Sequence, residues 1–217
     1  GSDAPPLLEW IGPEIVEDLG RFRMEDMILH EKLVYDVPVS YKAIVDGFNE
    51  VYHATQLHQT PPPFTKAARG TSFFTPGQNG MMFVPRPDAL DKLDETGDHH
   101  RYTICHYTVF PNTVFNNNPD QIQVFNPVPI DVDRTKFICW ELVYPHDPDD
   151  AQDQEAWAKT MAHWDVLKFI VSQDIGIYQE LAATKRSSGY TRNIFSEREC
   201  KLTHYHQVMD DMIRDRP

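Results

Sequence analysis

The sequence predicts an α+β fold in which a curved antiparallel sheet wraps around a long helix near the C-terminus. Two features support this prediction. The middle of the chain contains consecutive segments rich in β-branched and aromatic residues, and the last third has apolar residues at helical spacing. Turn-forming residues separate the segments, so neighbouring strands should be antiparallel, and strands followed by long helices indicate an α+β domain. The strands are expected over 80–84, 102–110, 121–130 and 136–144.

The first part of the chain predicts one more strand and one helix. The strand is expected over 28–34 and is followed by a turn. The helix is expected over 41–53, where apolar residues recur on one side. Three prolines at 61–63 cannot be helical, so this helix must end before them.

Two helices are predicted after the strands. The first is long, over 150–181, with a break expected near Ser172. The second is expected over 196–213, because Ser196 and Glu199 have the spacing of a capping box at its start.

The charge of the chain excludes several classes of partner. There are 33 acidic and 20 basic residues, and the net charge is −13. Nucleic acids and anionic membranes both require clustered positive charge, so neither is expected as a partner. No apolar run reaches the roughly 20 residues of a membrane span, and a cytoplasmic location is expected.

The cysteines and the termini suggest how the chain is organised. Cys105, Cys139 and Cys200 are too few and too scattered for a disulfide framework, and we expect buried free thiols. Residues 1–217 are expected to form a single domain. Its first two residues, Gly and Ser, look like a scar of tag cleavage, and the Pro-containing stretch after them would suit an interdomain linker. We therefore expect a fragment of a longer protein.

One short segment has a pattern that could bind a metal. Glu50 and His53 are three residues apart and would share a helix face. His53 and His58 are five apart, about 140° around an ideal helix, so they converge only if the helix ends or distorts between them. With a carboxylate from elsewhere they would form a facial site that favours ferrous iron. The alternative is one exposed and one hydrogen-bonded histidine. A zinc protease is excluded because the H-E-x-x-H order is absent.

The pattern E-x-x-H-x-x-x-x-H resembles the iron-binding motif of Rieske-type non-haem iron oxygenases, in the alpha (large) subunits of aromatic-ring-hydroxylating enzymes. Further segments are similar in order and spacing over about residues 40–213. They are Phe110-Pro111-Asn112, the stretch 126–135 with Asp133-Arg134-Thr135, Ser172-Gln173-Asp174 with Gln179-Glu180, and the last helix from Ser196 to Gln207.

The resemblance implies a helix-grip (START-like) fold and a set of iron ligands. His53, His58 and Asp174 would hold a mononuclear Fe(II). Asp174 lies in an otherwise apolar helical run, where a carboxylate needs a partner. Glu50 matches an acid, more often Asp, that serves as an electron-transfer bridge to a Rieske cluster in a neighbouring subunit. Glu in place of Asp changes the reach of that bridge and keeps its charge.

The resemblance also implies partners that this chain does not contain. An N-terminal Rieske domain would hold a 2Fe-2S cluster on C-x-H and C-x2-H ligands, and neither pattern occurs in this sequence. Electrons would come from NAD(P)H only indirectly, through a reductase or ferredoxin. The expected assembly is a homotrimer or a hetero-oligomer with a small subunit.

The implied reaction uses O2 to hydroxylate or dihydroxylate an aromatic or other apolar small molecule. Candidates for its pocket are Phe48, Leu57, Trp164 and Ile170, with ordinary core packing as the alternative for each. Two other functions stay open. One is a non-catalytic module that binds a hydrophobic ligand, and the other is a zinc hydrolase that uses Glu50 as its base.

The remaining histidines and acids are given no role in the site. His99 and His100 follow an acidic stretch and are expected in a solvated loop. His204 and His206 are two apart, on different helix faces, so a joint metal site is not expected. The acidic run 147–153 is expected at the surface near a helix N-terminus, where negative charge is favourable.

Overall fold

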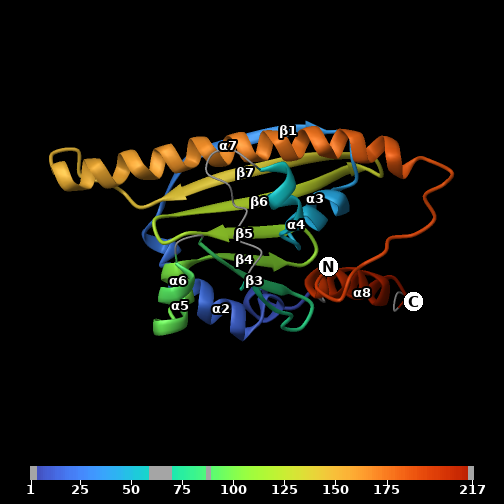
Figure 1. Ribbon diagram of the computed structural model, residues 1–217, viewed down its shortest axis with the longest axis horizontal. Helices are drawn as coiled ribbons and strands as arrows, with labels where there is room; N and C mark the ends of the chain where they lie inside the picture. Colours follow the sequence, from blue (N-terminus) through green and yellow to red (C-terminus); the bar gives the residue numbers. More distant parts are fainter. Residues whose placement is uncertain (1–3, 59–69, 87–88, 215–217) are drawn as a thin grey trace.

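The computed structural model describes residues 4–58, 70–86 and 89–214 and is built on one antiparallel sheet (Figure 1). In the described part of the chain the sheet has seven strands, in the order β1-β7-β6-β5-β4-β3-β2. Each long strand pairs with a neighbour along almost its whole length, and β6 and β7 form the hairpin with the longest register. The strands are β1 Ile28–Val37, β2 Ser72–Phe74, β3 Gly80–Pro85, β4 Thr103–Val109, β5 Thr113–Asn117, β6 Gln121–Asp131 and β7 Arg134–Val143.

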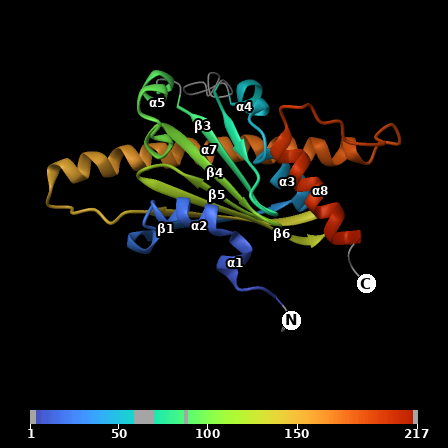
Figure 2. The ribbon, with the colours of Figure 1, turned by 90° about the horizontal axis from the view of Figure 1, so that it is seen from below.

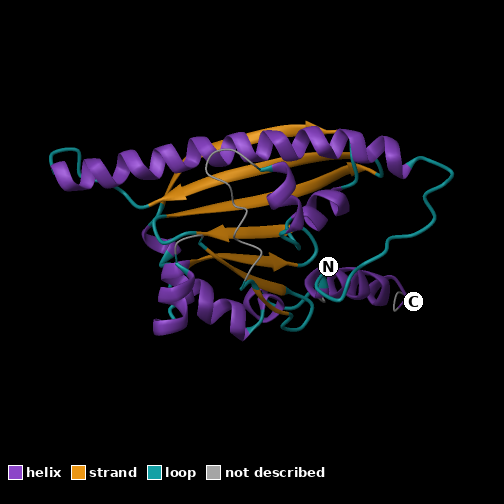
Figure 3. Ribbon diagram, in the orientation of Figure 1, coloured by secondary structure: helices purple, strands orange, loops and turns teal. Residues whose placement is uncertain are grey.

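Helices cover both faces of the sheet (Figures 2 and 3). The longest helix, α7, crosses one face together with α3 and α4, whereas α1 and α2 lie on the opposite side. None of the described helices combines the length and apolar character needed to cross a bilayer. The helices are α1 Leu7–Ile11, α2 Pro13–Gly20, the short 3-10 helix η1 Met24–Asp26, α3 Tyr41–Gly47, α4 Tyr52–Leu57, α5 Leu90–Thr96, α6 His99–Tyr102, α7 Ala151–Lys185 and α8 Cys200–Arg214.

Alternation along the strands assigns each side chain to one of two cores. Cys105 and Tyr107 of β4 pack with Ile15 and Phe22 on the α2 side of the sheet. On the other side Phe125, Phe137 and Cys139 pack with residues of α3 and α7, including Ile44, Val171 and Tyr178. This period of two is that of a strand with both faces covered. Phe125 and Val171 of this second core also line a pocket on the α7 side of the sheet.

The predicted fold is confirmed: a curved antiparallel sheet is covered by a long C-terminal helix. The predicted strands are present, but the sequence prediction missed two of the described strands, the three-residue β2 and the five-residue β5. The expected break near Ser172 is wrong, because α7 runs unbroken for 35 residues, roughly 50 Å. The Ser172 hydroxyl donates to the carbonyl of Phe169 at 2.6 Å, which satisfies it within the helix.

The prediction of a single helix over 41–53 is also wrong. The chain forms α3, which ends at Gly47, and then α4, which begins at Tyr52. Between them Asn49 is fully buried and accepts a hydrogen bond from the Thr108 hydroxyl at 2.8 Å, which anchors the interruption to β4. The carboxylate of Glu50 then accepts hydrogen bonds from the next free amides and starts α4.

The last helix begins later than predicted, at Cys200. The carboxylate of Glu199 accepts a hydrogen bond from the Ser196 amide at 2.5 Å, and the Glu199 amide donates to the Ser196 carbonyl at 3.0 Å. The predicted capping pattern therefore closes a turn just before the helix. Cys105 and Cys139 are buried thiols as expected, but Cys200 is exposed, which corrects the prediction for that residue.

Candidate metal centre

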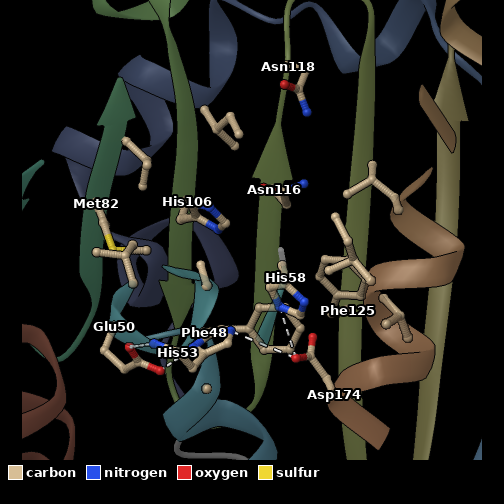
Figure 4. A pocket seen from close by; sticks show the side chains of 18 of the residues that line it. Phe48, Glu50, His53, His58, Met82, His106, Asn116, Asn118, Phe125 and Asp174 are labelled. Atoms are coloured by element: carbon tan, nitrogen blue, oxygen red, sulfur yellow. Dashed lines mark hydrogen bonds and ion pairs between the residues drawn. The ribbon is translucent and has the colours of Figure 1, made fainter. Parts of the chain in front are cut away.

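Three predicted ligands from distant parts of the chain meet at one point. His53 comes from α4, His58 from the residue after it, and Asp174 from the middle of α7. Nε2 of His58 lies 3.2 Å from Oδ1 of Asp174, and Nε2 of His53 lies 3.8 Å from the same oxygen. The centroids of the two imidazole rings are 5.2 Å apart, and the ring planes are nearly perpendicular, at 82°. Figure 4 shows the three side chains pointing toward one another.

The end of α4 explains how two histidines five residues apart can converge. The helix ends at Leu57, and His58 has φ −95° and ψ 62°, outside the helical region. This turn of the backbone brings the His58 ring back toward His53. The spacing of the two histidines predicts a helix that ends or distorts between them, and α4 ends immediately before the second.

Each imidazole is held through its other nitrogen. Nδ1 of His53 bonds to Oε1 of Glu50, and Nδ1 of His58 donates to Oε1 of Gln173 at 2.9 Å. A carboxylate or amide oxygen at Nδ1 selects the tautomer with its proton there. Both Nε2 atoms are then left as free acceptors directed at Asp174, an arrangement typical of metal-bound histidines.

Burial and charge act in opposite directions on His53. Burial is the largest effect and lowers the pKa of His53, but the hydrogen bond and charge of Glu50, with the charge of Asp174, outweigh it and raise the pKa above 6.5. His58 is only 3% exposed. Two imidazole nitrogens and one carboxylate oxygen, all within 4.8 Å of one another, form a donor set that suits a first-row divalent ion such as Fe(II).

A cavity of about 820 Å³, its open side included, extends from these three residues along the sheet. Its walls near the histidines are mostly apolar, and its far end is polar, with His106, Asn116 and Asn118 (Figure 4). Burial, and then the charges of Lys201 and His53, lower the pKa of His106 to about 3, so this ring is neutral. The cavity thus combines an apolar body with a few convergent polar groups, which is typical of a small-molecule site.

Two of the four predicted pocket residues line this cavity. They are Phe48, which stacks on Phe125 with ring centres 4.7 Å apart, and Ile170. Leu57 does not line it, because at the end of α4 its side chain faces an outer groove along α7. Trp164 does not line it either. It is 2% exposed, and its Nε1 donates to Oε2 of Glu31 at 2.6 Å, which turns the ring toward β1.

Sequence reasoning missed several residues of the site. Gln173 could have been noticed as the neighbour of Asp174, but only the structure shows that it bonds to His58. Three further residues line the cavity, and no local sequence motif contains them: His106, Asn116 and His163. His106 lies on β4 and Asn116 on β5, and His163 lies on α7, ten residues before Gln173. Nothing in their spacing along the chain links them to the histidine pair.

The prediction for His99 and His100 is wrong. They form part of α6 and are partly buried, with both Nε2 atoms next to Asp18 of α2. Asp18 is far away in the sequence, so the acidic stretch before the histidines was misleading.

His206 contacts a side chain of α3: its Nε2 lies 2.9 Å from Oδ1 of Asp46. Asp150 caps α7 by accepting from the amides of Gln152 and Asp153, so the acidic run lies at a helix N-terminus as predicted.

Comparisons with known proteins agree with this architecture. The family model of the ring-hydroxylating alpha subunit (catalytic domain) matches residues 24–215. No curated protein sequence matches the chain. One similar solved structure is the quaternary ammonium Rieske monooxygenase CntA in complex with inhibitor MMV12, at 16% identity and a TM-score of 0.75. Another is naphthalene 1,2-dioxygenase from Rhodococcus sp. bound to indole, at 14% identity and a TM-score of 0.71.

The matched structures are longer than this chain. The alignment with CntA covers 97% of this chain and 57% of that one, and the alignment with naphthalene dioxygenase covers 100% and 64%. At these identities the structures establish a common fold, whereas the family model extends over most of the sequence. The chain therefore belongs to the ring-hydroxylating alpha-subunit family and contains its catalytic domain.

Proposed function

We propose that this chain is the catalytic domain of a Rieske non-haem iron oxygenase that hydroxylates or dihydroxylates an aromatic or other apolar small molecule. The observation that supports it best is the convergence of His53 Nε2, His58 Nε2 and Asp174 Oδ1 at the end of a cavity. These three atoms would hold Fe(II). The bound iron would supply the site at which O2 is activated, in a coordination sphere with open positions.

The chain's own residues prepare the site before any metal arrives. Glu50 and Gln173 keep both Nδ1 positions protonated, which leaves the Nε2 lone pairs available. His58 and Asp174 are largely buried, so water competes weakly for the ligand atoms. The ligand set needs little rearrangement, because three donors already lie within 4.8 Å of one another.

The cavity favours a flat, mainly apolar substrate. Phe48 and Phe125 present stacked rings next to the histidines, and Val84, Ile104 and Ile170 add aliphatic wall. Such a wall excludes water and positions a substrate carbon near the ligand atoms. The polar far end, with Asn118 and His106, would orient a substrate that also has a hydrogen-bonding group.

Glu50 would connect this site to its electron supply. Its Oε1 is bonded to His53, while Oε2 accepts from the amides of Tyr52 and His53. We propose that Glu50 is the electron-transfer bridge to a 2Fe-2S cluster of a neighbouring subunit, in a trimer or a hetero-oligomer, with a reductase or ferredoxin as donor.

Metal reconstitution tests the ligand assignment. Chelator-treated chain is incubated with Fe(II) under anaerobic conditions, desalted and analysed for iron and zinc. We expect His53→Ala and Asp174→Ala each to lose one equivalent of iron relative to wild type, and the exposed His30→Ala to lose none. Full iron content in His53→Ala or Asp174→Ala would rule out the assignment, and zinc with hydrolytic activity would indicate the hydrolase instead.

Ligand binding tests the substrate class. Indole and L-carnitine, the molecules bound in two of the similar structures, serve as aromatic and quaternary ammonium probes. We expect indole to bind and Ile170→Trp to abolish its binding by filling the cavity. Trp164→Phe is the matched control, since Trp164 is buried but lies outside the cavity. Binding of L-carnitine and not indole would overturn the aromatic assignment.

A further inference from the structure

A second group of two histidines and one carboxylate lies on the opposite face of the sheet. Asp18 of α2 lies between His99 and His100 of α6. Oδ1 of Asp18 is 3.3 Å from Nε2 of His99 and 2.8 Å from Nε2 of His100. The three donor atoms all lie within 4.8 Å of one another. None of them belongs to the site described above.

Neighbouring groups hold this cluster in place. Asp18 is 8% exposed, and its other oxygen, Oδ2, accepts a hydrogen bond from the Tyr107 hydroxyl at 2.6 Å. Tyr107 is fully buried on β4, so the carboxylate is fixed relative to the sheet. A hydrogen-bonded second oxygen is the usual support of a metal-binding carboxylate.

Hydrogen bonding does not account for the position of His100. Its Nε2 is buried and makes no hydrogen bond with any residue that the structure describes, although Oδ1 of Asp18 is close by. The angle between the two groups is therefore not that of a hydrogen bond. A buried ring nitrogen that lacks a well-formed hydrogen bond is costly, and an ion shared with Asp18 would satisfy it.

The donor set is two nitrogens and one oxygen. Cys105 lies close to this cluster, with its Sγ 4.0 Å from the His99 carbonyl oxygen and 3.4 Å from the Thr103 hydroxyl oxygen, but it is not one of the three grouped donors.

We propose that Asp18, His99 and His100 form a second metal site, which binds a divalent transition ion such as Zn²⁺. Bonds of about 2.0–2.1 Å in a tetrahedral site separate neighbouring ligand atoms by roughly 3.3 Å, compared with 3.3 Å from Asp18 Oδ1 to His99 Nε2 and 2.8 Å to His100 Nε2. Two imidazoles and a carboxylate suit zinc rather than Mg²⁺ or Ca²⁺, which prefer oxygen ligands. The ion would link α2 to α6 and stabilise this face of the sheet.

The proposal is independent of the iron site, and its test separates the two. Chelator-treated chain is titrated with Co²⁺, followed by its visible absorption, and with Zn²⁺, followed by metal analysis. In the His53→Ala/His58→Ala background we expect one equivalent of Co²⁺ or Zn²⁺ to remain bound. Adding His99→Gln and His100→Gln should remove it, whereas adding His30→Gln, an exposed histidine outside both clusters, should not.

Two more variants test the geometry in the same background. Asp18→Asn keeps the shape of the side chain and should abolish binding, which covers the case in which the double histidine variant fails to fold. Tyr107→Phe frees Oδ2 and should weaken Zn²⁺ binding roughly 10-fold. Zn²⁺ should raise the midpoint of thermal unfolding in the His53→Ala/His58→Ala chain and not in Asp18→Asn. No bound metal in that background would show that the cluster is an ion pair only, and unchanged binding by Asp18→Asn would show that the metal binds without this carboxylate; either result would overturn the proposal.

Discussion

Gln173 accepts a hydrogen bond from Nδ1 of His58 at 2.9 Å, across a separation of 115 residues in the chain. Its neighbour Asp174 places Oδ1 3.2 Å from Nε2 of the same ring. Two consecutive residues of α7 therefore contact opposite nitrogens of one imidazole. The first selects the tautomer, and the second lies where a shared metal ion would bind.

This relationship predicts that Gln173→Leu will weaken iron binding without removing a ligand. Without the acceptor, the His58 ring can rotate or carry its proton on Nε2, and affinity should fall roughly 10- to 100-fold. Anaerobic Fe(II) titration measures the change. The matched control is Gln179→Leu, an exposed glutamine of the same helix, which should bind iron like wild type. Equal affinities for the two variants would contradict the role given to Gln173.

The raised pKa of His53 predicts how iron binding depends on pH. Iron must displace the proton from the imidazole, so apparent affinity should rise with pH through a midpoint above 6.5. Glu50→Gln keeps a hydrogen-bond acceptor but removes the charge that raises the pKa, so its midpoint should lie lower. Titrations of both proteins at several pH values test this. A midpoint that does not move in Glu50→Gln would contradict the account.

The same shift has a consequence for the metal-free chain. His53 binds its proton more tightly in the folded than in the unfolded state. Its contribution to stability is therefore complete below pH 6.5 and is lost as the pH rises through the raised folded value.

The close contact between Gly47 and Tyr178 predicts that substitutions at these two positions have coupled effects on stability. A Cβ atom on Gly47 would lie 2.5 Å from the Tyr178 hydroxyl oxygen, in a region where Tyr178 is 5% exposed. Gly47→Ala should therefore destabilise the fold by about 1–3 kcal/mol through overpacking. Tyr178→Phe removes the clashing oxygen at the loss of one long hydrogen bond, 3.4 Å, to the Ile44 carbonyl.

The double variant distinguishes this clash from other effects of alanine. Gly47→Ala/Tyr178→Phe should be more stable than Gly47→Ala alone in chemical denaturation, because the hydroxyl is no longer in the way. If the two free-energy changes simply add, the clash is not the cause.

The buried amine of Lys201 should make the stability difference between wild type and Lys201→Met depend on pH. It is 1% exposed, and burial lowers the pKa of its amine from 10.5 to about 7. The unfolded chain then binds this proton more readily than the folded chain between pH 7 and 10.5, so wild-type stability should increase as the pH rises through that window. Lys201→Met keeps the aliphatic stem and removes the amine.

We expect Lys201→Met to be more stable than wild type by about 1–3 kcal/mol near pH 7, because no charge has to be buried. The advantage should shrink as the pH approaches 10.5. Urea unfolding of both proteins across this range measures the difference, in which other titrating groups cancel. A difference that is constant with pH would exclude Lys201 as its source.

The sequence was sufficient for five of the seven described strands, for the long helix and, through the family resemblance, for the three candidate ligands. Strand periodicity and turn residues are local signals, and the E-x-x-H-x-x-x-x-H pattern is local too. Asp174 was assigned through the resemblance to the oxygenase family, and its place in an apolar helical run, where a carboxylate needs a partner, is consistent with that assignment. These inferences required no knowledge of how distant segments pack.

What could not be predicted depends on side-chain direction and on long-range packing. Leu57 and Trp164 have suitable chemistry for a pocket, but the end of α4 and the bond to Glu31 turn them away from it. The environment of His99 is set by Asp18, 81 residues earlier. The start of α4 depends on a carboxylate cap from Glu50, which a helical wheel cannot show.

The most direct test of whether His53, His58 and Asp174 bind one Fe(II) is an anaerobic crystal structure of the reconstituted chain. Anomalous diffraction would be recorded on both sides of the iron absorption edge. If these three residues are the iron ligands, we expect an iron peak within bonding distance of His53 Nε2, His58 Nε2 and a carboxylate oxygen of Asp174. An iron-loaded crystal without a peak between these three atoms would contradict it.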